Sequence, residues 1–353
     1  DFELAKKLNH NAHRLSIEWS RIEPREGEFS DAELRHYLEV IFSLRARNIE
    51  PVVTLHHFTN PVWLSEMGGW ENRRSVTRFL RYCDFVTRSL ARHVHYWITI
   101  NEPTVYMSHA YIFGRWPPQA RSFLKAKRVE NNLLAAHIKA YRLIHQIYQE
   151  LKLAAPSLGI AHHMQAFVPC TQGLRDRLAA YLRNKWYNFG LLDKIARRKA
   201  MDFIGFNYYS RQLVDLEKWG IGNLLFDTCK SNHYPVKKNS LGWDIYPKGL
   251  HELLLQLRKY GLPVMITENG ICTSDDNLRW EYIYAHLRNI HLAMEEGAVV
   301  AGYLYWSLMD NFEWDEGFSP RFGLIEVDYK DYRRTVRESA EKLARVAKAN
   351  ILE

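Results

Sequence analysis

The sequence predicts an α/β protein built as a parallel (β/α)8 barrel, the TIM-barrel architecture. Short apolar runs rich in β-branched residues alternate along the chain with segments of helical periodicity, and polar residues follow most of the runs. Helices between successive strands imply a parallel sheet. A barrel brings all the carboxyl ends of its strands to one mouth, whereas an open sheet offers only a crevice near one switch point. The pattern therefore favours the barrel.

The strand candidates are short and are separated by helix-like stretches, of which the clearest span residues 31–48 and 129–152. We expect strands at residues 12–17, 51–58, 97–100, 158–168, 201–209, 264–267 and 302–308. Polar residues at their carboxyl ends are His57, Asn101, Glu102, Asn207, Tyr209, Glu268 and Asn269. Seven candidates are found where a complete barrel has eight. Residues 213–240 lack a clear period and are expected to form a long surface loop.

The chain of 353 residues is long enough for one large α/β barrel. It contains no linker rich in Pro, Gly or Ser, no low-complexity segment and no short repeat. We therefore expect residues 1–353 to form a single catalytic domain.

Composition and charge exclude several classes of function. The net charge is +8, but the sequence contains no basic stripe interleaved with aromatic residues, so nucleic-acid binding is not expected. No window approaches the 18 apolar residues of a membrane span, and the first ten residues contain no signal-peptide core. The four cysteines form no CxxC pair and are expected to be free thiols. These features together predict a cytoplasmic protein without a membrane partner.

Two apolar runs end in a glutamate beside an asparagine, in "TINEP" (99–103) and "ITENG" (266–270). A glutamate at a strand end is usually a structural ion-pair partner. Two of them on strand ends of one barrel, however, supply the pair of carboxyl groups that glycoside hydrolysis needs. One carboxyl group protonates the leaving oxygen, and the other attacks or activates water.

These two motifs resemble the acid/base and nucleophile signatures of glycoside hydrolase family 1, the β-glucosidase family. Further stretches resemble that family in the same order and cover nearly the whole chain: "HRLSIEWSRIEP" (13–24), "PVVTLHHF" (51–58), "GGW" (68–70), "DFIGFNYYS" (202–210), "GWDIYPKGL" (242–250), "YLYWSLMDNFEW" (303–314) and "RFGLIEVD" (321–328). The resemblance implies a retaining exo-β-glycosidase that needs neither cofactor nor metal. Its implied substrates are small β-glucosides or oligosaccharides, with β-galactosides and β-fucosides as further candidates.

The resemblance also implies a role for each matching residue. Glu102 matches the general acid/base, and Glu268 matches the nucleophile that forms the glycosyl-enzyme. The family's retaining mechanism would use a protonated Glu102 and an ionised Glu268. Residues matching those that support the nucleophile are Arg14, Asn207 and Tyr209. Residues matching those that bind the substrate are His57, Asn101, Trp306, Glu313, Trp314 and, for the aglycone, Trp116.

Glu313 narrows the class of sugar that is expected as substrate. Relatives that act on phosphorylated sugars carry a small hydroxyl residue with a nearby Lys at this place, because a carboxylate would repel the phosphate. The glutamate therefore predicts an uncharged sugar. The nearby Arg321 could offset part of that repulsion.

The chain departs from the family pattern at two places. Family members begin with a strand that carries a glycone-binding Gln ahead of the region that resembles residues 1–24, and this strand has no counterpart here. We expect that the given chain omits it, since an unpaired barrel edge would leave backbone donors and acceptors unsatisfied. Phe58 also replaces a more usual Trp after the His, which keeps a ring at that position.

Alternative functions have weaker support in the sequence. A catalytically inactive, glycan-binding relative is the main alternative, but such proteins typically lose one of the two carboxylates. Metal binding by His56 and His57 or by His162 and His163 is not expected, because adjacent strand residues point to opposite faces. The sequence does not indicate an oligomeric state.

Overall fold

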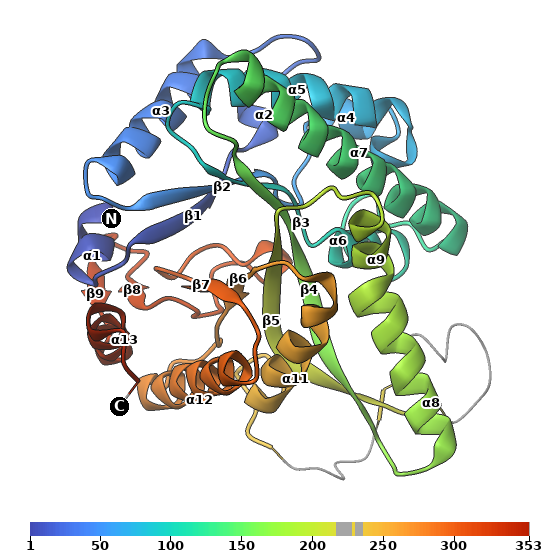
Figure 1. The fold of residues 1–353 in the computed structure, drawn as a ribbon, viewed down its shortest axis with the longest axis vertical. Coiled ribbons are helices and arrows are strands. Elements are labelled where there is room, and N and C mark those ends of the chain that lie inside the picture. Colours follow the sequence, from blue (N-terminus) through green and yellow to red (C-terminus); the bar gives the residue numbers. More distant parts are fainter. Residues whose placement is uncertain (217–227, 230–235, 353) are drawn as a thin grey trace. The chain divides into compact units, whose positions relative to one another are not determined.

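The computed structural model describes residues 1–216, 228–229 and 236–352 (Figure 1). The chain divides into two compact units. Unit 1 comprises Asp1–His163 and Lys194–Gly205, and unit 2 comprises Met164–Asp193 and Phe206–Glu353. Whether the two units act as the single domain expected from the sequence stays a prediction.

The main sheet has seven strands in the order of the chain, β1 to β7. They are β1 (Ala12–Ser16), β2 (Glu50–His56), β3 (Tyr96–Asn101), β4 (Ser157–Pro169), β5 (Phe203–Val214), β6 (Val264–Asn269) and β7 (Val300–Tyr305). Sequential order is typical of a (β/α) barrel, because a doubly wound sheet reverses its order at the switch point. Each strand overlaps one of the seven predicted runs, so the predicted fold class and strand count are confirmed.

The helices of unit 1 cover β1 to β3. They are α1 (Phe2–Lys7), α2 (Trp19–Ile22), α3 (Asp31–Arg45), α4 (Val62–Glu66), α5 (Arg74–Leu90), α6 (Pro103–Tyr111) and α7 (Phe123–Glu150). The helix α5 packs along α7 (Figure 1). The predicted helices at 31–48 and 129–152 correspond to α3 and α7. The latter begins earlier than predicted because the Ser122 hydroxyl accepts a hydrogen bond from the Lys125 N–H and caps its first turn.

Unit 2 has its own helices and a small second sheet. Besides strands of the main sheet and the 3-10 helices Arg258–Tyr260 and Trp314–Glu316, it contains α8 (Leu174–Arg183), the π-helix Asn184–Phe189, α11 (Pro247–Leu257), α12 (Asp276–Glu295), α13 (Glu338–Ala349) and the antiparallel pair β8 (Ile325–Val327) and β9 (Arg334–Val336). The helix α9 (Gly190–Ala196) spans the boundary between the units. In unit 2, α11 packs against α12 (Figure 1). Among the described residues, no helix is both long and apolar enough to cross a membrane.

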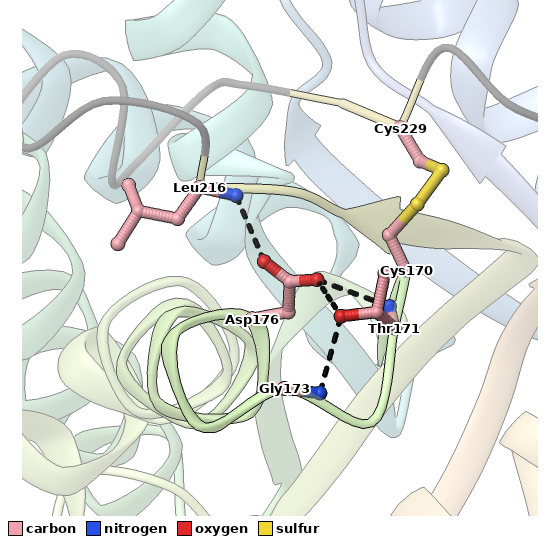
Figure 2. The surroundings of a disulfide bond; sticks show 6 residues. All are labelled: Cys170, Thr171, Gly173, Asp176, Leu216 and Cys229. Carbon is pink, nitrogen blue, oxygen red and sulfur yellow. Dashed lines mark hydrogen bonds between the residues drawn. A yellow bond between two sulfur atoms is a disulfide. The ribbon is translucent and has the colours of Figure 1, made fainter.

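The expectation of four free thiols is wrong for one pair of cysteines. Cys170, directly after β4, forms a disulfide with Cys229, whereas Cys83 and Cys272 are free and buried (Figure 2). The Cys170 N–H donates to the Val214 carbonyl at 2.8 Å, and the Cys229 N–H donates to the Leu213 carbonyl at 3.1 Å. The two cysteines are 59 residues apart. Their pairing depends on the path of β5, which no local spacing reveals.

The Asp176 carboxylate on α8 supports this disulfide (Figure 2). One of its oxygens accepts from the Thr171 N–H at 3.0 Å and from the Thr171 hydroxyl at 2.6 Å. The other accepts from the Leu216 N–H at 3.1 Å. One buried carboxylate therefore binds both the residue that follows Cys170 and the residue Leu216 after β5, the strand to which the Cys229 N–H donates. Residues 217–227 and 230–235 of the loop predicted at 213–240 lie outside the described part of the chain.

Candidate active site

The predicted acid/base, Glu102, lies where β3 passes into α6. It is 7% exposed, and its backbone is in the left-handed region, with φ 43° and ψ 56°. A left-handed glutamate is costly, since its Cβ crowds the backbone. The next residue, Pro103, begins α6, where its missing N–H and fixed φ suit the first turn. The register between β3 and β4 also shifts between Ile98 and Asn101. The sequence thus ends the strand sharply at this carboxylate.

Three predicted site residues of unit 1 form one hydrogen-bonded chain. Arg14 donates from Nη2 to Asn101 Oδ1 at 2.6 Å and from Nε to Thr54 Oγ1 at 3.1 Å. The Asn101 amide then donates from Nδ2 to His57 Nε2 at 3.0 Å. Burial, and then the positive charges of Arg14 and His56, hold the pKa of His57 well below its usual range. His57 is therefore neutral and carries its proton on Nδ1, where it can donate.

Trp116, the predicted aglycone contact, lies in a cluster of rings in unit 1. Its ring centroid is 4.8 Å from that of Phe58 and 4.7 Å from that of His109. Phe58 has a positive φ of 71° and is stacked edge-on against His57 at 5.1 Å. The Phe58 ring therefore contacts both His57, which belongs to the hydrogen-bonded chain of Arg14 and Asn101, and Trp116. His109 was not predicted, because a lone His on a helix carries no local signal.

The predicted nucleophile, Glu268, lies near the end of β6 in unit 2 and is 4% exposed. The Tyr209 hydroxyl donates to Glu268 Oε2 at 2.7 Å. Asn207, two residues earlier on β5, accepts from the Thr267 hydroxyl at 2.5 Å. The Tyr209 phenol therefore holds one oxygen of the Glu268 carboxylate in a defined position.

Gly270 in the "ITENG" motif has a steric role. A Cβ atom there would lie 1.9 Å from the Trp306 carbonyl oxygen, a distance that no side chain tolerates. The Trp306 N–H in turn donates to the Asn269 carbonyl at 3.0 Å. Glycine therefore allows the segment that carries Trp306 to lie directly against the segment that carries Glu268.

Glu313 and the two predicted glycone tryptophans, Trp306 and Trp314, lie in the same unit as Glu268. The pKa of Glu313 is raised to about 7, first by burial and then by the negative charge of Glu268, and a hydrogen bond with Trp306 opposes part of this rise. Trp314 follows in the left-handed region with φ 48°. Glu313 is thus close enough to Glu268 for the two charges to oppose each other.

A buried carboxylate that the sequence analysis missed, Asp310, fixes the loop that carries Glu313. It accepts from the Gly323 N–H at 2.9 Å and pairs with Arg337 at 2.9 Å and Arg321 at 3.3 Å. Arg321 also donates to the Val327 carbonyl and lies over the Tyr329 ring at 4.9 Å. This guanidinium is therefore engaged by Asp310, which weakens the expectation that it could offset a substrate phosphate.

Among the described residues, one group of side chains has the ligand types and spacing of a metal site: Cys170, Asp215 and Cys229, whose ligand atoms lie within 4.8 Å of one another. Its two sulfur atoms are joined in the disulfide. Thiolates, the form in which cysteine binds metals, are therefore absent from this group.

A parallel sheet in sequential order with glutamates at the ends of β3 and β6 is typical of a barrel enzyme of the glycoside-hydrolase class. The chain belongs to glycosyl hydrolase family 1, because the sequence model of that family matches residues 1–197 and 192–351. The predicted family, enzyme class and barrel fold are thereby confirmed.

Solved structures agree with this assignment. The β-glycosidase from Pyrococcus horikoshii is 38% identical and superposes with a TM-score of 0.93 over 99% of this chain and 84% of its own. The β-glucosidase from Thermotoga maritima in complex with glucoimidazole is 30% identical, with a TM-score of 0.90 over 100% of this chain and 86% of its own.

Curated relatives have several activities. Beta-glucosidase A of Thermotoga maritima is 31% identical over 100% of this chain and 86% of the relative, and a beta-galactosidase of Sulfolobus acidocaldarius is 30% identical over 98% and 82%. A 6-phospho-beta-galactosidase of Clostridium acetobutylicum is 31% identical over 98% and 85%. The chloroplastic galactolipid galactosyltransferase SFR2 of Arabidopsis thaliana is 31% identical over 99% of this chain, which spans 57% of that relative's length.

Proposed function

We propose that this protein is a retaining exo-β-glycosidase that hydrolyses unphosphorylated β-glucosides through a covalent glycosyl-enzyme. β-Galactosides and β-fucosides are proposed as further substrates. The observation that carries the proposal is the buried Glu268 carboxylate at the end of β6, which receives a hydrogen bond from Tyr209 in a chain of this family. Relatives named as β-glucosidase and β-galactosidase support the same class of reaction.

The proposed reaction has two steps. In the first, Glu268 attacks the anomeric carbon while Glu102 gives a proton to the leaving oxygen, so that the aglycone departs and an ester forms. In the second, Glu102 takes a proton from water, which attacks the anomeric carbon and releases Glu268. Two inversions retain the β configuration. We assign Asn101, whose amide is oriented by Arg14 and His57, to the sugar 2-hydroxyl.

The first test replaces the proposed nucleophile. Glu268→Gln keeps the shape of the side chain but cannot form the ester, so we expect kcat on an aryl β-glucoside to fall by at least about 1,000-fold, the range seen when a nucleophile is lost. The exposed Glu281→Gln on α12 is the matched control and should keep wild-type kinetics. Near-normal turnover by a clean preparation of Glu268→Gln would exclude this role.

A second test addresses the acid/base. Glu102→Ala should still form the glycosyl-enzyme from substrates with good leaving groups, and azide should then restore turnover and give a β-glycosyl azide. NMR spectroscopy of the product identifies its configuration. If azide has no effect on the rate or the product, Glu102 is not the acid/base.

The preference for unphosphorylated sugars rests on Glu313. A phosphate on the sugar 6-oxygen would place a second negative charge near this half-buried carboxylate, and Arg321 is engaged by Asp310. We expect kcat/KM for an aryl β-glucoside to exceed that for its 6-phosphate by about 1,000-fold, equivalent to about 4 kcal/mol. Glu313→Ser should narrow the ratio. Equal kcat/KM values in the wild type would overturn the substrate assignment and leave the catalytic assignments standing.

Glycosyl transfer is the second candidate function, favoured by the similarity to a galactolipid galactosyltransferase over 99% of this chain. The same glycosyl-enzyme would pass its sugar to a sugar hydroxyl in place of water. Product analysis with an aryl β-galactoside and a galactoside acceptor separates the two functions. Release of free sugar as the main product supports hydrolysis, whereas oligosaccharide as the main product supports transfer.

A further inference from the structure

A buried amide, that of Asn269, lies beside the proposed nucleophile in the chain. Asn269 follows Glu268 on β6 and is fully buried. Because successive side chains of a strand point to opposite faces, its amide lies behind the strand rather than on the face of Glu268. Its Oδ1 accepts from the Tyr303 hydroxyl at 2.9 Å. Its Nδ2 donates to the Tyr208 carbonyl at 2.7 Å and to the Tyr282 hydroxyl at 2.9 Å.

The Tyr282 hydroxyl makes a second contact that leads back to the nucleophile. It donates to the Tyr209 carbonyl at 3.2 Å, and the Tyr209 hydroxyl donates to Glu268 at 2.7 Å. One hydroxyl from α12 therefore connects β6, which carries Glu268, with the residue on β5 that donates to Glu268. Its hydrogen-bonding capacity is used as both donor and acceptor.

The surroundings of Tyr282 hold this hydroxyl in place. The ring centroid of His286 lies 3.8 Å from that of Tyr282, and His286 Nδ1 contacts the Tyr282 carbonyl at 2.7 Å. Burial raises the pKa of Tyr282 well above its ordinary value, so its proton stays on the phenol and remains available to Tyr209. A phenylalanine would fill the same space without a hydroxyl. Burying a hydroxyl costs desolvation free energy unless the hydroxyl is hydrogen-bonded.

We propose that Tyr282 is a positioning residue for the glycosidase reaction, and that its hydroxyl sets the position of Glu268 relative to the Tyr209 phenol. This inference rests on the proposed nucleophilic role of Glu268. Tyr282 is 2% exposed and its hydroxyl binds Asn269, so we assign it no contact with the sugar. It acts through Asn269 on the strand of the nucleophile and through the Tyr209 backbone on the phenol that binds the nucleophile. The Tyr303 hydroxyl binds the carbonyl oxygen of the same Asn269 side chain.

The chemical consequence concerns the first step of the reaction. Attack on the anomeric carbon requires the nucleophilic oxygen to be within a few tenths of an ångström of its productive position, and a misplacement of about 1 Å costs about 100-fold in rate. Substrate binding depends on other side chains. Loss of the Tyr282 hydroxyl should therefore lower the rate of ester formation and leave ground-state binding of the sugar nearly unchanged.

The experiment measures ester formation directly in the full chain. The probe is 2,4-dinitrophenyl 2-deoxy-2-fluoro-β-D-glucopyranoside, on which Glu268 displaces dinitrophenolate and keeps the fluorosugar as a stable ester. Release of dinitrophenolate gives the rate constant of inactivation, kinact, and its concentration dependence gives Ki. Mass spectrometry of the peptide that contains Glu268 confirms the site of labelling.

For Tyr282→Phe we expect kinact and kcat to fall by about 10-fold to 100-fold, with Ki and KM within about twofold of wild type. Tyr284→Phe, on the same helix, is the matched control and should keep wild-type values. Tyr303→Phe should reproduce the effect in a smaller degree. Circular dichroism and thermal unfolding show whether each variant is folded, and Tyr303→Phe carries the test if Tyr282→Phe does not fold.

The outcomes separate this inference from the proposed function. If the wild type is not labelled at Glu268, the proposed function fails and this inference fails with it. If the wild type is labelled and folded Tyr282→Phe reacts at the same kinact, the positioning role is overturned while the proposed function stands. A rise in Ki or KM with kcat unchanged would also overturn it, because it would assign the hydroxyl to substrate binding.

Discussion

At the scale of single residues, several assigned positions carry a backbone conformation that side chains rarely adopt. Glu102 and Trp314 have positive φ values, as does Phe58 beside His57. Each such position costs about 1–3 kcal/mol and persists only where the surrounding structure enforces it. The sequence could place Glu102 and Phe58 at strand ends, but it could not predict the backbone conformation of any of the three residues, because neither glycine nor asparagine stands at these positions.

The first prediction concerns the stability cost of Glu313. Its pKa is raised to about 7, above the value of 4.5 for an unperturbed glutamate, so the folded state holds a proton that the unfolded state releases between these values. Stability conferred by this proton is present below about pH 4.5 and is lost as the pH rises through about 7. Ionised Glu313 therefore destabilises the fold at pH 8.

Glu313→Gln should accordingly raise the midpoint of thermal unfolding at pH 8 by a few degrees, equivalent to at most about 3 kcal/mol. The difference from wild type should shrink as the pH is lowered toward 5. The exposed Glu316→Gln in the same loop is the control and should show no such trend. An unchanged difference between pH 5 and pH 8 would contradict the role of burial in raising this pKa.

At the scale of elements, local periodicity located the strands but not all of their ends. The strand β5 continues to Val214, beyond the predicted end at Tyr209. The added segment contains Arg211, a charged residue that is 8% exposed and pairs with Asp244 at 2.8 Å. In the sequence a charged residue such as arginine indicates the end of a strand, and Asp244, which pairs with Arg211, lies 33 residues away. The strand end could therefore not be predicted from local pattern alone.

The second prediction concerns the loop between β7 and β8, which Asp310 fixes. Asp310→Asn keeps the shape of the side chain but leaves the Arg337 and Arg321 guanidinium groups without their buried anion. We expect a loss of about 3–5 kcal/mol in the free energy of unfolding, because breaking a buried ion pair leaves an uncompensated charge. KM for a β-glucoside should rise too, since the same loop carries Glu313. Urea unfolding and steady-state kinetics measure the two effects.

Glu326→Gln provides the comparison for this variant. Glu326 lies 4.0 Å from the same Arg337, but its side chain is 57% exposed. An exposed pair contributes about 0–1 kcal/mol, so this variant should differ little from wild type. Equal effects of the two substitutions would show that the Asp310 carboxylate does not organise the loop.

At the scale of the whole molecule, the strand order and the candidate residues could be predicted because each depends on short, ordered motifs. Strand ends such as "TINEP" and "ITENG" combine an apolar run, a carboxylate and a helix or turn signal in a few residues. Asp310, Tyr282 and the disulfide could not be predicted in the same way. Asp310 binds Arg321 across 11 residues, the disulfide joins residues 59 apart and Tyr282 binds Tyr209 across 73, so only the folded path brings these partners together.

The third prediction concerns the Cys170–Cys229 disulfide, which joins residues 59 apart. Closing a loop of this size in the unfolded chain contributes about 4 kcal/mol to stability in the chain-entropy model. The double variant Cys170→Ser with Cys229→Ser should lose a stability of that order in urea unfolding. A phosphine reductant should have the same effect on wild type and no effect on the double variant. A wild type that is insensitive to the reductant would contradict this prediction.

The same bond also changes the covalent topology of the chain. Residues 170 to 229 and the disulfide form a closed ring, with the rest of the polypeptide attached as two tails. Hydrolysis of any one peptide bond within the ring opens it without dividing the molecule, whereas one cut in either tail releases a fragment. A protease that nicks the protein once inside the ring therefore leaves a species that migrates as one chain on a non-reducing gel. The same species separates into two fragments, one bearing each terminus, when a reductant is added.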